Sequence, residues 1–157
     1  MNSADAIEAA LELHHSGRNE EARALYRQIL EEKPTDVSVT HLLGLTYLSD
    51  PDWRQGIALI EQVIKLRPKM PVYHFSLGVG WGDYGECEAA RSSFRRAIDL
   101  KADYGEAWHA WVQTQKYTEG GADLDHIREQ LGRQLDDGSL CFFSFAAGKI
   151  CDDIGAY

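Results

Sequence analysis

Cysteine is scarce in this chain, and its three residues are unevenly spaced. Cys87, Cys141 and Cys151 stand 54 and 10 positions apart, a pattern typical of neither a disulfide framework nor a CxxC metal or redox motif. Reduced thiols of this kind are usual in the cytoplasm, where disulfides rarely persist. We therefore predict a cytoplasmic protein without disulfide bonds.

Basic residues are also few. Lys and Arg number 16 against 25 Asp and Glu, which gives a formal net charge of −9, and no run of clustered basic residues stands out. Nucleic acids and anionic membrane surfaces are recognised by clustered cations, so both are excluded as expected partners. No stretch approaches the roughly 18 apolar residues of a membrane span. The N-terminus lacks the basic and apolar segments of a signal peptide.

Motifs that would indicate catalysis are missing as well. The chain has no GxGxxG after a strand, no P-loop, no GxSxG and no HExxH. A metal site needs several ligands within reach on one face, whereas the histidines are spread along the chain at His14, His15, His41, His74, His109 and His126. We predict that the protein is not an enzyme and has no catalytic, cofactor-binding or metal-binding residues. A catalytic metal site at the histidines is the alternative, which metal analysis would test.

The chain does contain a repeat with a period of 34 residues. Its 157 residues, 44% of them hydrophobic, suffice for one domain. Pro34 and Pro68 each follow an apolar run, and Ala102 takes the same place one period later. Other positions in register are Leu43 and Leu77, Gly44 and Gly78, Tyr47 and Trp81, the small residues Ala22, Gly56 and Ala90, and the large residues Tyr26, Ile60 and Phe94. This period is typical of a helix–turn–helix unit, in which small residues allow close packing and proline ends the second helix.

These residues resemble the tetratricopeptide repeat (TPR) family. The third repeat follows the family signature most closely, with Ala102 in place of the usual proline; its matching residues are Leu77, Gly78, Trp81, Gly85, Ala90, Phe94 and Ala97. The resemblance implies an all-α, right-handed superhelical solenoid of antiparallel helix pairs. Its full repeats would span 3–36, 37–70 and 71–104.

After residue 104 the repeat pattern weakens. Arg128 stands where the second helix of a repeat should carry an aromatic residue, so 105–138 is predicted to be a degenerate fourth unit. The run 139–157 is predicted to be the first helix of an incomplete fifth unit. Together these units predict about nine helices, starting near residues 3, 19, 37, 53, 71, 87, 105, 123 and 139. The end of the chain, 145–157, also resembles a segment of bacterial proteins in which TPR repeats precede a sulfotransferase domain.

First helices line the concave face in stacked helix pairs, so the resemblance places a partner-binding groove on them. Counting from the packing residues gives the groove set: Ile7, Leu11, His14, His41, Leu45, Leu48, Phe75, Val79, His109, Gln113 and Lys116. The set lacks the Lys and Asn clamp with which the family binds a peptide C-terminal carboxylate. Its apolar and histidine side chains suit an amphipathic helix or an extended apolar segment.

The C-terminal run carries more apolar side chains than one neighbour can cover. An uncovered apolar surface tends to find a partner, so we predict a homodimer through this helix. The contact residues would be Phe142, Phe143, Phe145, Ile150 and Ile154. The competing outcome is a monomer in which the helix folds back on Leu124, Ile127 and Leu131.

Two functions are compatible with this sequence. The first is a non-catalytic scaffold that binds a peptide or partner protein in the groove. The second is an N-terminal accessory or oligomerisation module of a bacterial, sulfotransferase-like enzyme, whose catalytic domain would not be in this chain. A fold does not identify a partner, so the sequence leaves the ligand open.

Overall fold

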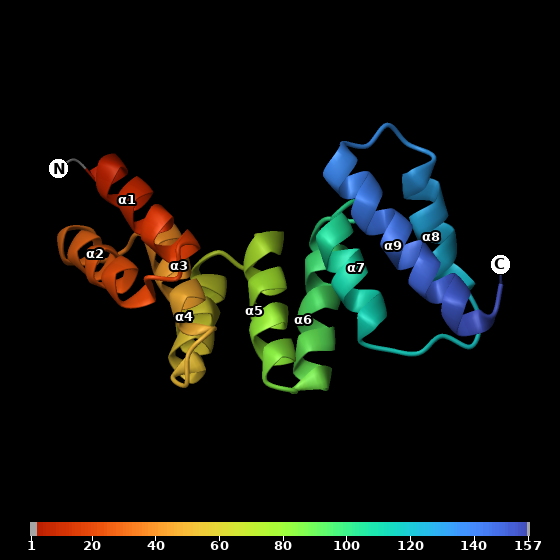
Figure 1. Ribbon diagram of the computed structural model, residues 1–157, viewed down its shortest axis with the longest axis horizontal. Helices are drawn as coiled ribbons and strands as arrows, with labels where there is room; N and C mark the ends of the chain where they lie inside the picture. Colours follow the sequence, from red (N-terminus) through yellow and green to blue (C-terminus); the bar gives the residue numbers. More distant parts are fainter. Residues whose placement is uncertain (1–2, 157) are drawn as a thin grey trace.

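The computed structural model describes residues 3–156, and every regular element in that range is an α-helix (Figure 1). The helices are α1 (Ser3–His15), α2 (Asn19–Glu32), α3 (Val37–Tyr47), α4 (Trp53–Leu66), α5 (Pro71–Asp83), α6 (Cys87–Leu100), α7 (Gly105–Gln113), α8 (Gly121–Leu131) and α9 (Asp137–Ile154). The all-α prediction is confirmed. The first seven helices start at the predicted residues, and α8 and α9 start two residues early. Tyr157, the end of the predicted fifth unit, lies outside the described residues.

Local signals in the sequence place the helix ends. Gly17 and Gly85 occupy the turns after α1 and α5 with φ of 76° and 78°, a left-handed conformation that glycine adopts without strain. Asp36 caps α3 by accepting a hydrogen bond from the backbone N–H of Val39 at 3.1 Å. Asp136 caps α9 in the same way through Ser139 at 2.9 Å. This cap explains why α9 starts earlier than the repeat period predicts.

Small residues bring the helices of one unit close together. A Cβ atom on Gly56 would lie 2.6 Å from the carbonyl oxygen of Gly44, so α3 and α4 cross almost backbone to backbone. In the next unit, a Cβ atom on Gly78 would lie 2.5 Å from the ring of Phe94, which fills the space between α5 and α6. Gly78 therefore serves close helix packing, the role that the repeat predicts for its small residues.

The fourth unit is built differently. At the positions equivalent to Gly78 and Ala90 it carries Val112 and Leu124, so α7 and α8 cannot approach as closely as the earlier pairs. Instead α7 packs on α9, which lies between α7 and α8 (Figure 1). Gly105 permits the contact, because a Cβ atom there would lie 3.2 Å from Cβ of Phe142. Residues 105–138, predicted as a degenerate fourth unit, therefore contain two helices that pack mainly on α9 and not on each other.

The loop between α7 and α8 is fastened to α9. The backbone N–H of Tyr117 donates to a carboxylate oxygen of Asp153 at 3.0 Å, and Lys149 pairs with the same carboxylate. These contacts lower the pKa of Asp153, chiefly through the hydrogen bond from Lys149. They hold the long loop around the end of α9, so that α9 stays between its two neighbours.

The buried apolar residues form three clusters along the solenoid. The N-terminal cluster is Ala6, Ala10, Ala22, Tyr26, Ile29, Val39, Leu43 and Tyr47. The middle cluster is Leu48, Trp53, Ile57 and Ile60. The C-terminal cluster is Ala90, Phe94, Ala97, Ile98, Ala107, Trp108, Trp111, Val112, Tyr117, Leu124, Ile127, Phe143, Ala146 and Ile150. The core is therefore distributed along the axis, as expected for stacked repeats.

Candidate functional site

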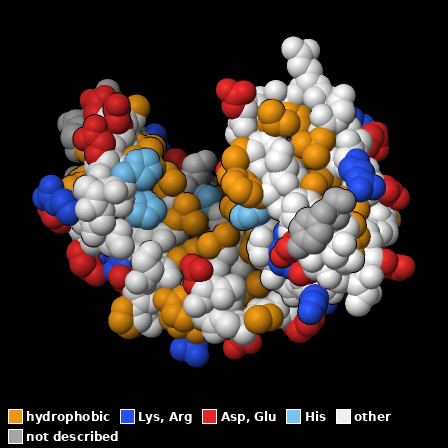
Figure 2. Space-filling model, turned by 45° about the vertical axis from the view of Figure 1, so that its right-hand side comes forward, with side chains coloured by type: hydrophobic (Ala, Val, Ile, Leu, Met, Phe, Trp, Pro, Cys, Tyr) orange, Lys and Arg blue, Asp and Glu red, His pale blue; other side chains and the backbone are white. Residues whose placement is uncertain are grey.

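The stacked helices enclose a hollow on one side of the molecule. Figure 2 shows this hollow between the N-terminal and C-terminal parts, with hydrophobic side chains across its floor and histidines on its walls. Most of the predicted groove residues are half-buried, namely Ile7, Leu11, His14, Leu45, Phe75, Val79 and His109, whereas Gln113 and Lys116 are exposed. Half-buried apolar residues from successive first helices supply the surface that a partner would need to cover.

His41 departs from the predicted groove set, because the structure buries it between repeats. Its Nε2 atom lies 2.9 Å from the hydroxyl oxygen of Ser76 on α5, and its ring centroid lies 4.7 Å from that of Tyr73. Burial lowers the pKa of His41 to about 4, so the ring is neutral at physiological pH. The side chain joins the second unit to the third and offers little surface to a ligand.

Leu48 is also corrected from groove to core. It belongs to the middle cluster, where its methyl groups occupy space next to two glycines. A Cβ atom on Gly56 would lie 3.0 Å from Cδ2 of Leu48, and one on Gly80 would lie 2.9 Å from the same atom. Neither glycine could be enlarged without moving Leu48, so this leucine holds α3, α4 and α5 together.

Two of the predicted groove residues, Phe75 and His109, belong to groups of aromatic side chains. The ring centroid of Phe75 lies 5.3 Å from that of Tyr104 and 5.8 Å from that of Phe94. The ring of His109 lies 5.8 Å from Phe142 and 6.0 Å from Phe145 on α9. Phe75 therefore has one side in the core, and His109 connects α7 to the aromatic face of α9.

The predicted oligomer residues differ widely in burial. Phe143 and Ile150 are completely buried in the C-terminal cluster with Leu124 and Ile127, so α9 folds back on α8 in the manner of the competing outcome. Phe142 and Ile154 are half-buried, whereas Phe145 is 61% exposed. The homodimer itself stays a prediction, and its contact would now rest mainly on Phe145.

The described residues contain no group of three or more His, Cys, Asp or Glu side chains placed to hold a metal ion. His74 instead places Nε2 2.9 Å from the carbonyl oxygen of Pro68, and His126 stacks on Trp108 at 4.8 Å between ring centroids. Within residues 3–156, none of the helices combines the length and apolar character that crossing a membrane requires. The hollow therefore remains the main candidate site.

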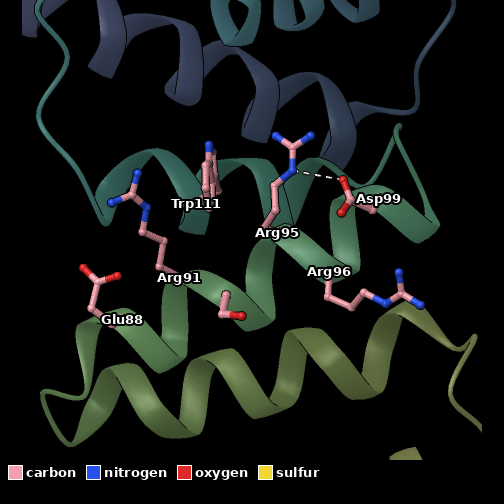
Figure 3. Close-up of a pocket in the computed structure, with 7 residues that line it drawn as sticks. Glu88, Arg91, Arg95, Arg96, Asp99 and Trp111 are labelled. Carbon is pink, nitrogen blue, oxygen red and sulfur yellow. Dashed lines mark hydrogen bonds and ion pairs between the residues drawn. The ribbon is translucent and has the colours of Figure 1, made fainter.

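A second recess lies on α6, at residues that the sequence analysis did not single out. It is an open pocket of about 500 Å³ lined by Glu88, Arg91, Ser92, Arg95, Arg96, Asp99 and Trp111 (Figure 3). The available signal was three arginines within six positions on one helix. The arginines form a pocket only together with Trp111 of α7, and the sequence alone does not show that this tryptophan lies beside them.

Comparison with known proteins identifies the fold. No family model and no curated protein sequence matches this chain. A solved structure of MamA, labelled AMB-1, has a TM-score of 0.62 at 23% identity and covers 92% of this chain and 77% of that one. MamA from Desulfovibrio magneticus RS-1, from residue 41 to its end, has a TM-score of 0.66 at 12% identity, with 83% and 75% covered.

A further similar structure is a variant of the O-GlcNAc transferase of Thermobaculum terrenum. It has a TM-score of 0.65 at 21% identity, and the match covers 85% of this chain but 27% of the transferase. The likeness concerns the repeat region of that enzyme. At these identities the comparisons show the fold alone, which is a TPR-type helical repeat solenoid.

Proposed function

We propose that this TPR-type solenoid is a non-catalytic protein-interaction scaffold of the cytoplasm, which binds a helix or peptide of a partner protein in its hollow. The observation that carries the proposal is the row of half-buried apolar side chains on successive first helices. The cytoplasmic location is supported by Cys87, Cys141 and Cys151, all of which are unpaired thiols.

The chemistry of the hollow favours an amphipathic helix as the ligand. The apolar members of the groove set, among them Leu11, Leu45, Phe75 and Val79, are half-buried and would supply an interrupted apolar floor. Burial, with smaller contributions from His15 and Arg23, lowers the pKa of His14, which favours the neutral form of this groove-set residue. A helix with one apolar stripe would cover the floor and leave its polar face in solvent.

The test is a selection from a phage-displayed library of helical peptides, with the intact chain as target. The selected peptides are then measured against Leu45→Lys and Val79→Lys. A lysine can extend its charged end into solvent, which limits damage to the fold. The control is Leu66→Lys on α4, which places the same charge on a side chain that is 57% exposed and outside the predicted groove.

Each groove substitution is expected to weaken peptide binding by about tenfold or more, and the control by less than about twofold. Circular dichroism and melting temperature establish that each variant is folded. Failure to select any binder, or equal binding to groove and control variants, would contradict the assignment.

The second candidate, an accessory module of an enzyme, rests on a different observation. In the Thermobaculum terrenum protein a repeat region like this one is part of a much longer O-GlcNAc transferase. A sulfotransferase-like or other transferase domain encoded in the same reading frame would support this candidate. Sequencing the flanking gene decides the point, and the groove would then position a substrate protein or a neighbouring subunit.

A further inference from the structure

The surface of α6 is unusual in a chain that carries a net charge of −9. Arg91, Arg95 and Arg96 contribute three of its 16 basic residues within six positions, against Glu88 and Asp99 on the same surface. We call the pocket that these residues line with Ser92 and Trp111 the α6 arginine surface. Its arginines stand on α6, a second helix, whereas Trp111 comes from α7, one of the first helices that carry the predicted groove.

Trp111 gives the arginines a fixed platform. Its indole N–H donates to a carboxylate oxygen of Asp123 at 3.0 Å, which fixes the ring. The guanidinium carbons of Arg91 and Arg95 lie 5.3 and 5.7 Å from the ring centroid, within the range of cation–π contact. Two cations are therefore held beside one aromatic ring, which lies between them in Figure 3, before any ligand arrives.

The charges of these arginines are only partly balanced within the described residues. Arg91 donates to the neutral side-chain oxygen of Gln115 at 2.6 Å. Arg95 pairs with Asp99 at 3.0 Å, and both side chains are exposed, so an incoming carboxylate can exchange with Asp99 at little cost. No ion pair or hydrogen bond is found for Arg96 in residues 3–156 (Figure 3). Since each guanidinium carries five donors, most of them remain available.

The arrangement of the guanidinium groups indicates the shape of the ligand. Arg91 and Arg95 are one helical turn apart, which separates their Cβ atoms by roughly 5–6 Å. Figure 3 shows the three groups pointing in different directions along α6, not towards one common point. A compact anion such as phosphate would engage one or two of them, whereas carboxylates spaced along a polypeptide would engage the row.

We propose that the α6 arginine surface binds an acidic helical segment of a partner protein, with carboxylates about one turn apart. Each carboxylate accepts paired hydrogen bonds from one guanidinium, a geometry that lysine cannot offer. The scaffold then has two surfaces of different chemistry, one apolar and one cationic. None of the residues that line the α6 arginine surface belongs to the groove set, so the two surfaces use different side chains.

The test uses the full chain and a fluorescein-labelled helical peptide with glutamates at i and i+4, read by fluorescence polarisation at low and high salt. The variant Arg91→Gln/Arg95→Gln/Arg96→Gln removes the surface. Its matched control, Arg54→Gln/Lys65→Gln/Arg67→Gln, removes three exposed cations of α4 and its C-cap, so the change in net charge is the same.

The α6 variant is expected to bind at least about tenfold more weakly, and the control less than about twofold. Added salt should weaken the wild-type complex, and a peptide with glutamine in place of glutamate should not bind. If the triple variant fails to fold, Arg95→Gln/Arg96→Gln replaces it, because both residues are exposed; a loss of about threefold or more is then expected.

Three results would overturn the proposal. Equal losses in the α6 and control variants would mean that net charge alone attracts the peptide. Displacement of the peptide by inorganic phosphate, with the ionic strength held constant, would indicate a phosphate site. Loss of peptide binding in Leu45→Lys, with retention in the α6 variant, would place the acidic peptide in the hollow. Failure of the library selection would leave this test unaffected, so the two proposals can fail separately.

Discussion

Replacing Gly56 by alanine is expected to destabilise the protein, although the same change in an open helix is stabilising. The new Cβ atom would lie 2.6 Å from the carbonyl oxygen of Gly44, 3.0 Å from Cδ2 of Leu48 and 3.1 Å from Cβ of Tyr47. The first contact is with backbone, which cannot rotate away. The two helices must therefore separate, and the packing around the fully buried Ile60 loosens with them.

Two opposing effects set the magnitude. Alanine in a helix interior gains about 1 kcal/mol over glycine, while overpacking a tight contact costs about 1–3 kcal/mol and more where backbone must move. We expect a net loss of about 1–2 kcal/mol, which lowers Tm by about 3–6 °C for a chain of this length.

Gly148→Ala on α9 is the matched control. No heavy atom lies within 4 Å of a Cβ built at Gly148, so the propensity gain of about 0.5–1 kcal/mol should appear alone. Urea unfolding followed by circular dichroism compares the two variants with the wild type. If Gly56→Ala raises the unfolding midpoint as Gly148→Ala does, the close crossing of α3 and α4 is refuted.

Two further predictions concern His41 and α9. Because burial lowers the pKa of His41 to about 4 from 6.5, its contribution to stability is complete above about pH 6.5 and is lost as the pH falls towards 4, since the unfolded chain takes up the proton first. The urea midpoint should fall more steeply over that interval for the wild type than for His41→Gln, and equal slopes would contradict the burial. Phe143→Ala should cost about 3–5 kcal/mol, because the ring is completely buried. Phe145→Ala, at a position 61% exposed, should change stability by less than about 0.5 kcal/mol; similar losses in urea unfolding would show that α9 is packed on another face.

Most of the fold could be predicted from the repeat period of 34 residues. Pro34 and Pro68, with the glycines of the turns and helix contacts, predicted the first residue of each of the first seven helices. The period predicted the starts of α8 and α9 less accurately. It also could not show that α9 would pack on α7 in the place that α8 takes in a regular repeat. Val112 and Leu124, read at the positions of Gly78 and Ala90, were the available signal for this exchange.

The candidate site was less accessible to prediction. Helix periodicity shows which residues share a face, but the burial of His41 depends on Ser76 and Tyr73 in the next repeat. For Leu45 and Val79, which the structure leaves half-buried, the groove assignment stays a prediction. The α6 arginine surface depends on Trp111 from another helix, a contact that no local pattern encodes.

Because the core is divided into three clusters, each junction of the solenoid depends on its own set of side chains. The middle cluster is the smallest, with Leu48, Trp53, Ile57 and Ile60, and it lies between two larger ones. Stacking of Trp53 on Tyr84, with ring centroids 4.1 Å apart, links α4 to the end of α5 across this narrow part. The junction between the second and third units therefore depends on a few large side chains, and Trp53 takes part in both the buried cluster and the ring stack. Replacing Trp53 would remove both contacts at once, whereas the N-terminal and C-terminal clusters would keep all of their own side chains.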